Sequence, residues 1–198
     1  LSSNKTKITD LYKKKANFLG FEIFYQRNKL NRKVNKGSET LAPVTQRFGT
    51  MEYHPDTDRI EQRFILKKYM TKNGTPREIG FLTALQDHEI ITKYNQFMLG
   101  IGNYYIRQIS YPSRLCRWFY ILYYSCIKTL ATKHKTSVKD IIKTYGHLDL
   151  SNPTVNKRKP AATDLRIITS YKRNNQKKYA ILLNYKEIMF QLLQIKEK

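Results

Sequence analysis

The chain has 198 residues, with 37 Lys and Arg against 15 Asp and Glu, and a formal net charge of +22. A hydrophobic content of 40% with 15 tyrosines excludes a fully disordered chain, because such chains lack the apolar residues that a core needs. The positive surplus favours a polyanionic partner, either a nucleic acid or an anionic membrane surface. No apolar run reaches the roughly 18–20 residues of a membrane-spanning helix, so we expect no span.

The first residue is Leu1 rather than Met and no leader follows it, so we expect a piece of a longer protein. Cys116 and Cys126 fall in a segment that reads as helix, about 15 Å apart along its axis, and therefore cannot pair with each other. Free thiols are typical of an intracellular reducing compartment. The histidines and cysteines make no metal-binding spacing, so we expect no metal site.

Residues 1–36 carry a local charge of +8 around an apolar segment, residues 17–25. This segment predicts a strand or hairpin bent at Gly20, and both an ordinary hairpin and a ligand-approaching glycine fit it. The stretch that follows, residues 28–51, is polar and irregular.

His54-Pro55-Asp56 then predicts the start of a helix that continues to Lys68 and is stopped at Lys72-Asn73-Gly74. Three of its cations lie four residues apart on one face, which is either simply solvated or contacts phosphates.

Apolar residues at helical spacing predict an amphipathic helix over residues 87–110. Gly100 and Gly102 interrupt it at a cost of about 1 kcal/mol each relative to Ala. Either another backbone packs closely there or the helix bends.

A second amphipathic helix is predicted over residues 115–135. Its core side lies opposite Arg117, and the outer face carries Arg and Lys with one tyrosine. No acid occurs between Ser110 and Lys139. Cations that neutralise phosphates and a tyrosine that stacks on an unpaired base favour a nucleic-acid contact, although a basic face is also common on surface helices. The candidate RNA-binding residues are Arg59, Arg63, Lys67, Arg107, Arg114, Arg117, Tyr124, Lys128, Lys133, Lys135, Lys139 and Lys143.

Toward the C-terminus, Ser137 and Asp140 predict the capping box of a short helix that Gly146 closes. A basic, proline-bounded linker over residues 151–160 precedes a β-hairpin predicted from residues 165–171 and 179–183, and a last helix starts at Asn184, capped with Glu187. We therefore expect a mainly α fold. It is a helical bundle with a short β element at the N-terminus and a β-hairpin plus helix near the C-terminus.

Motifs for nucleotide binding and for nucleophilic catalysis are absent from the sequence. The acid pairs Asp56/Asp58 and Asp87/Glu89 are better explained as charges at helix N-termini than as metal ligands. The residues by themselves predict a binding module with no catalytic residue, metal or cofactor.

Several segments resemble the reverse transcriptase/maturase proteins that group II introns encode. Residues 1–8 followed by Phe18, Leu19, Gly20 and Phe21 resemble the end of the polymerase palm and its primer grip. Residues 87–95, 100–105 and 125–135 resemble the maturase domain, domain X, in order and spacing. The positions that match its signature are Tyr94, Asn95, Gly100, Asn103, Tyr104 and Tyr105.

The resemblance implies the end of the palm over residues 1–26, the thumb over 27–80 and domain X over 81–150. Residues 151–198 are then the basic linker with the C-terminal hairpin and helix. It further implies a maturase that binds group II intron RNA within its pre-mRNA and promotes splicing by stabilising the folded RNA. DNA would be a partner only through a longer parent.

The alternative is a fragment of a multifunctional RNA-directed DNA polymerase that acts in intron mobility. The Tyr-x-Asp-Asp motif of such enzymes is absent here and would lie upstream of Leu1, so its presence in an extended frame would separate the two. A generic basic ribonucleoprotein component is a third interpretation. The richness in Lys, Asn, Ile and Tyr fits an A/T-rich organellar genome, mitochondrial or alternatively chloroplast.

Overall fold

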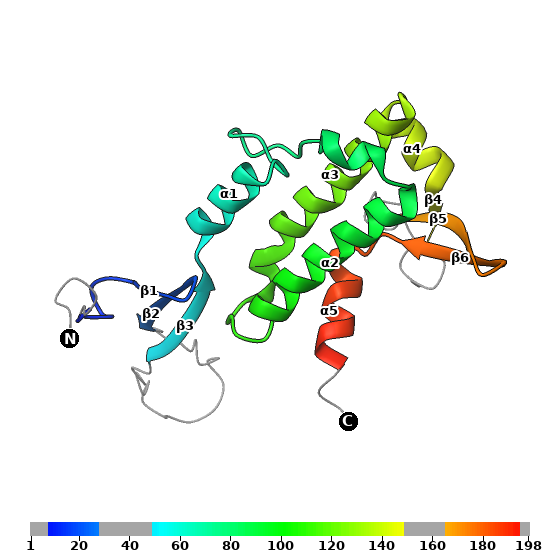
Figure 1. Cartoon of the computed structure of the whole chain (residues 1–198). Coiled ribbons are helices and arrows are strands. Elements are labelled where there is room, and N and C mark those ends of the chain that lie inside the picture. Colours follow the sequence, from blue (N-terminus) through cyan, green and yellow to red (C-terminus); the bar gives the residue numbers. More distant parts are fainter. Residues whose placement is uncertain (1–7, 28–48, 149–164, 195–198) are drawn as a thin grey trace, which may run out of the picture. The chain divides into compact units, whose positions relative to one another are not determined.

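The computed structural model describes residues 8–27, 49–148 and 165–194 (Figure 1). The predicted linker over residues 151–160 lies outside this part, as do Leu1 and most of the polar stretch after residue 27. The chain divides into two compact units, which we describe separately. One takes the residues up to Asp56 with 109–111, and the other takes 57–108 with the residues from 112 onward.

The described part of the first unit is an antiparallel sheet in the order β1 (Ala16–Phe18), β2 (Phe21–Arg27) and β3 (Gly49–Pro55). Leu19 and Gly20 join β1 to β2 with φ values of 50° and 83°, as in a tight hairpin turn, which confirms the hairpin prediction.

The assignment of His54-Pro55 to the start of a helix is wrong. These residues end β3, where Glu22 pairs with His54 and Phe21 with Pro55. The buried Glu52 and His54 side chains are 2.9 Å apart, and Tyr111 donates to the same carboxylate at 3.2 Å. Long-range pairing with β2 thus converts residues that carry no strand pattern of their own into a strand.

The second unit begins with α1 (Thr57–Leu66), which is shorter than predicted because Lys68 adopts a positive φ of 62°. The chain continues through η1 (Gly80–Ala84) into α2 (Asp87–Tyr105), and through η2 (Pro112–Leu115) into α3 (Cys116–His134). Both long helices were predicted, but the predicted end of α2 at residue 110 is five residues beyond its actual end at Tyr105. Then come α4 (Val138–Tyr145) and, near the C-terminus, α5 (Tyr185–Gln194).

A second antiparallel sheet has the order β4 (Gly146–Leu148), β5 (Leu165–Arg173) and β6 (Gln176–Ile181). The predicted hairpin is confirmed, with Asn174 and Asn175 both at positive φ in its two-residue turn. The predicted caps of the last two helices are also confirmed. Ser137 exchanges hydrogen bonds with Asp140, and Asn184 with Glu187.

Helix α3 is the centre of the second unit (Figure 1), since α2, α4, α5, η1 and η2 all pack against it. Its buried arc is wider than the predicted core side, because Ile121, Ser125 and Thr129 are buried on the flank that was expected to face outward. The described chain is therefore mainly helical, with more strand than the sequence led us to expect.

The two glycines of α2 have different environments. Gly100 is exposed, and a methyl group there would meet nothing within 4 Å. A methyl group on Gly102 would lie 2.6 Å from Leu192 Cδ1 and 3.1 Å from Ile188 Cγ2. Of these two glycines, only Gly102 is closely packed, because the Leu192 and Ile188 side chains of α5 lie against it.

Candidate RNA interface

Contacts within the protein engage at least five of the predicted RNA-binding cations. Arg117 forms an ion pair with Glu61 at 3.1 Å, and Lys133 pairs with Asp87 at 2.7 Å. Lys128 Nζ donates to the carbonyl oxygen of Pro76 at 2.8 Å, so its cation anchors the loop before η1. The remaining two are Lys67, over the Phe97 ring, and Arg107, which donates to Leu192. Part of the predicted basic face therefore stabilises the fold.

The other predicted cations are exposed at the surface: Arg59, Arg63, Arg114, Lys135, Lys139 and Lys143. Three of them belong to one region of the second unit. Lys139 and Lys143 are four residues apart on α4, whose buried residue is Ile141, and Lys135 is the C-cap of α3, which packs against α4. We call Lys135, Lys139 and Lys143 the α4 basic cluster.

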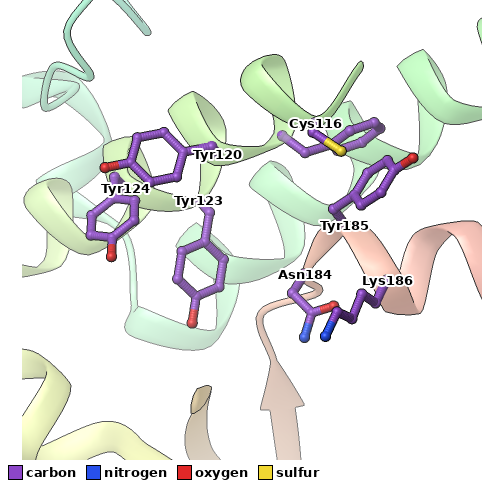
Figure 2. Close-up of a pocket in the computed structure, with 8 residues that line it drawn as sticks. Cys116, Tyr120, Tyr123, Tyr124, Asn184, Tyr185 and Lys186 are labelled. Atoms are coloured by element: carbon purple, nitrogen blue, oxygen red, sulfur yellow. The ribbon is translucent and has the colours of Figure 1, made fainter. Parts of the chain in front are cut away.

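Tyr124, the predicted stacking residue, lines a pocket of about 230 Å³ between α3 and the start of α5 (Figure 2). Aromatic side chains form most of its wall. The lining residues are Cys116, Phe119, Tyr120, Tyr123, Tyr124, Asn184, Tyr185 and Lys186. The sequence offered one signal for this group, the tyrosines at positions 120, 123 and 124, which share a side of a helix. No sequence pattern indicated that residues at the start of α5 would line the same pocket.

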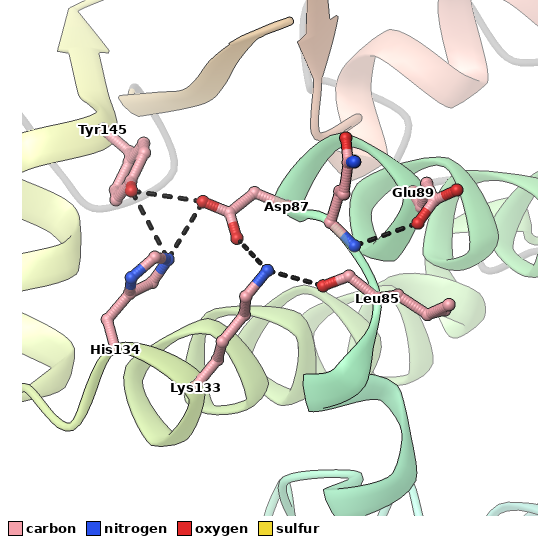
Figure 3. A network of polar contacts seen from close by, with 7 residues as sticks. Leu85, Asp87, Glu89, Lys133, His134 and Tyr145 are labelled. Carbon is pink, nitrogen blue, oxygen red and sulfur yellow. Dashed lines mark hydrogen bonds and ion pairs between the residues drawn. The ribbon is translucent and has the colours of Figure 1, made fainter.

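A polar network at the start of α2 joins three helices (Figure 3). The Asp87 carboxylate pairs with Lys133 Nζ at 2.7 Å and with His134 Nε2 at 2.9 Å, and it accepts a hydrogen bond from the Tyr145 hydroxyl at 3.2 Å. Although burial acts in the opposite direction, contacts with Lys133 and His134 hold the pKa of Asp87 below its ordinary value. The prediction that Asp87 is a helix N-terminal charge is confirmed, and its cross-helix partners were missed.

Tyr94, which was predicted to match the domain X signature, is buried in a hydroxyl cluster. Its hydroxyl lies 2.9 Å from Ser125 Oγ and 3.0 Å from Thr129 Oγ1. Ser125 donates to the Arg77 carbonyl and Thr129 to the Ser125 carbonyl. Both hydroxyl oxygens are therefore acceptors for the single proton of the Tyr94 hydroxyl. Burial raises the pKa of Tyr94 and keeps it protonated.

We expect Tyr94→Phe to lower the free energy of unfolding by about 0.5–1.5 kcal/mol, because one net hydrogen bond is lost without a cavity. Urea unfolding measures the loss. RNA affinity at fixed salt should stay at the wild-type value, since the ring is 1% exposed. A loss of affinity without a loss of stability would contradict this structural role.

The other positions that were predicted to match this signature have different environments. Asn95 donates to the Ile181 carbonyl at 2.7 Å and accepts from the Leu183 amide at 3.0 Å, so it fixes the end of β6 to α2. Tyr105 is buried, whereas Gly100, Asn103 and Tyr104 are exposed. These predicted positions therefore include both internal supports and surface residues.

The hairpin of β5 and β6 supplies a basic element that sequence reasoning treated only as a turn. Four exposed cations lie within seven residues, with no acid among them: Lys172, Arg173, Lys177 and Lys178. Tyr171 pairs with Lys178 across the hairpin, and its ring stacks on His88 of α2 with centroids 4.1 Å apart and an interplanar angle of 6°. The hairpin thus contacts α2 by stacking, and its four cations flank the turn at Asn174 and Asn175.

In the first unit, the primer-grip-like residues form the turn between β1 and β2. Phe18 and Leu19 are 63% and 65% exposed, while Gly20 is buried and its carbonyl accepts from the Asp56 amide at 2.9 Å. Phe21 opens β2. The turn therefore presents apolar side chains outward.

Within the described ranges, no three His, Cys, Asp or Glu side chains gather as metal ligands. No helix among those residues is long and apolar enough to cross a membrane.

Comparison with known proteins gives a consistent set of relatives. Residues 57–192 match the family model described as type II intron maturase. The chain is 31% identical over 157 residues to the group II intron-encoded protein LtrA of Lactococcus lactis subsp. cremoris, an alignment of 73% of this chain with 24% of that protein.

Two further relatives come from eukaryotes. Maturase K of Marchantia polymorpha is 35% identical over 104 residues, covering 52% of this chain and 28% of that protein. The COX1/OXI3 intron 1 protein of Saccharomyces cerevisiae is 31% identical over 161 residues, covering 74% and 18%. The chain thus spans between 18% and 28% of the length of these three relatives.

Proposed function

The chain belongs to the type II intron maturase family, and from this we propose that it binds group II intron RNA within its pre-mRNA and promotes splicing by stabilising the folded RNA. The family match over residues 57–192 carries the proposal. The net charge of +22 supports it, because compact RNA brings phosphates together and cations lower their repulsion. In this mechanism the intron RNA performs the chemistry.

We assign the phosphate contacts to the exposed cations of the second unit. The α4 basic cluster and the four cations of the β5–β6 hairpin are the leading groups, because they are exposed and concentrated. Lys128 and Lys133 support the RNA surface indirectly, by fixing Pro76 and Leu85 in the loops around η1.

We also propose the domain assignment that the resemblance implies, with the palm end over residues 1–26, the thumb over 27–80, domain X over 81–150 and the linker, hairpin and helix over 151–198. The conformation of the β1–β2 turn supports the first of these, since its outward apolar side chains suit contact with a nucleic-acid strand. An organellar origin, mitochondrial in the first instance, is proposed on composition alone.

Splicing of the host intron at low magnesium tests the function. We expect the 198-residue chain to raise the fraction of spliced transcript where the RNA alone splices poorly. The triple variant Lys135→Gln, Lys139→Gln, Lys143→Gln should reduce this gain. It should also flatten the slope of log affinity against log salt by about 2–3, near 0.7–0.9 for each lost phosphate contact.

The unfolding midpoint provides the control, since all three side chains are exposed and their exchange should leave it unchanged. An unchanged salt slope would remove the α4 basic cluster from the interface. Absence of any splicing gain with the wild-type chain would contradict the proposed function itself.

A further inference from the structure

The pocket between α3 and α5 is lined mainly by aromatic side chains, with four tyrosines and Phe119 among its eight lining residues (Figure 2). We propose that it receives a single unpaired nucleobase of the bound RNA. This proposal rests on the proposed function and adds to it a defined contact with single-stranded RNA.

The size of the pocket limits its occupant. Its volume of about 230 Å³ is smaller than the roughly 300–1,000 Å³ of sites for drug-sized ligands. A groove for a partner helix would need a row of anchor positions, whereas this is one hollow. One planar ring system is a group of suitable size.

The aromatic side chains are arranged to stack on such a ring. Tyr120 and Tyr124 lie one turn apart on α3, with ring centroids 4.5 Å apart, and Tyr120 is 54% exposed. Tyr123 is deeper, 8% exposed, with its ring at 72° to that of Tyr124. An accessible ring at the mouth and tilted rings within offer a base both a stacking face and edge contacts.

The polar groups suit a neutral base with a phosphate beside it. Burial raises the pKa of Tyr123, Tyr124 and Tyr185, so their hydroxyls remain protonated at neutral pH and can bond to base edges. Lys186 is exposed at the rim. The neighbouring carboxylate, Glu187, is bound by Arg166 at 2.6 Å and by the Asn184 amide at 2.8 Å.

This charge pattern argues against the other ligand that aromatic pockets take, an organic ammonium group. A lysine at the rim and a chain of net charge +22 repel a cation, and the lining contains no carboxylate. Both features attract the phosphate that accompanies a nucleobase.

The test compares Tyr120→Leu with Phe190→Leu. Both replace an aromatic ring that is more than half exposed, but Phe190 lies on α5 outside the pocket. We expect Tyr120→Leu to weaken binding of single-stranded uridine and adenosine decamers by at least about fivefold, from the lost stacking. Binding of an RNA duplex, and the salt slope, should not change, and Phe190→Leu should bind both RNAs like wild type.

Photocrosslinking of a decamer that carries 5-iodouridine gives a second readout that does not depend on a variant's stability. We expect crosslinks at Tyr120 or Tyr124. Equal losses for single-stranded and duplex RNA, or crosslinks confined to other elements, would overturn the pocket proposal while splicing promotion by the wild-type chain continued. Failure of the wild-type chain to bind intron RNA or promote its splicing would instead contradict the proposed function.

Discussion

Gly102→Val is expected to lower the free energy of unfolding by about 1–3 kcal/mol, the usual cost of overpacking a filled core. A single methyl at this position already approaches Leu192 Cδ1 to 2.6 Å and Ile188 Cγ2 to 3.1 Å. Leu192 can change its rotamer, but the Ile188 methyl is attached at the branched Cβ and has little freedom. The substitution should therefore push α5 away from α2, and urea unfolding with an unchanged m-value would measure the loss.

Gly100→Val is the matched control, since it makes the same change in the same helix at an exposed position with nothing within 4 Å. Because Val and Gly differ by only a few tenths of a kcal/mol in helix propensity, its stability should stay within about 0.5 kcal/mol of wild type. Equal losses in the two variants would mean that helix propensity, rather than contact with α5, accounts for the effect.

Asp87→Asn is expected to cost about 1–3 kcal/mol at pH 7, the range for leaving a partly buried polar group without its partner. The variant keeps the shape of the side chain but removes the charge that pairs with Lys133 and His134. The amide oxygen of asparagine can accept from Lys133, but the NH2 group that replaces the other oxygen cannot accept from the Tyr145 hydroxyl or from His134. Thermal or urea unfolding at pH 7 measures the difference.

The expected pH dependence of the stability follows from the direction of the Asp87 pKa shift. The pKa of Asp87 is lower in the folded protein than in the unfolded chain, so its stabilisation is fully present above the unfolded value, about 3.9, and is lost as the pH falls through the folded value. The stability difference between wild type and Asp87→Asn should thus shrink as the pH falls below about 4. A difference that grew between about pH 4 and pH 2 would contradict this assignment.

Glu89→Gln serves as the control for Asp87→Asn. Glu89 is in the same first turn, and its carboxylate accepts the Gln86 amide at 2.9 Å in a capping box. Glutamine can fill the same capping position, so the loss should be only a few tenths of a kcal/mol. A loss as large as that of Asp87→Asn would show that helix-end charge, and not the cross-helix network, is the source.

Much of the local structure could be predicted, because its determinants are close in sequence. Capping boxes at Ser137 and Asn184, the turn at Gly20 and the 3.6-residue periodicity of α2 and α3 each depend on residues within one or two turns. The secondary-structure prediction was wrong where a segment distant in sequence determines the conformation, as at His54, which pairs with Glu22 in a sheet.

The same distinction between local and distant determinants applies to the candidate RNA interface. Sequence periodicity placed Lys128 on the outward face of α3, and the family resemblance added Lys133, but neither indicates what lies beside the helix. In the folded chain, the carbonyl oxygens of Pro76 and Leu85 accept hydrogen bonds from the two ammonium groups, Lys128 and Lys133 respectively. The exposed cations of α4 and the hairpin are consequently better candidates for phosphate contacts.

The sequence by itself determined the charge of +22, the order of the helices and the family resemblance, since these depend on composition and local spacing. Only the tertiary structure decided which cations remain available to RNA and which are internal supports. It also decided that Tyr120 and Tyr124 share a pocket with Tyr185, about sixty residues away in the chain. The physical reason is that hydrogen bonds and pockets form between surfaces, and the pairing of surfaces is fixed by packing of the whole chain.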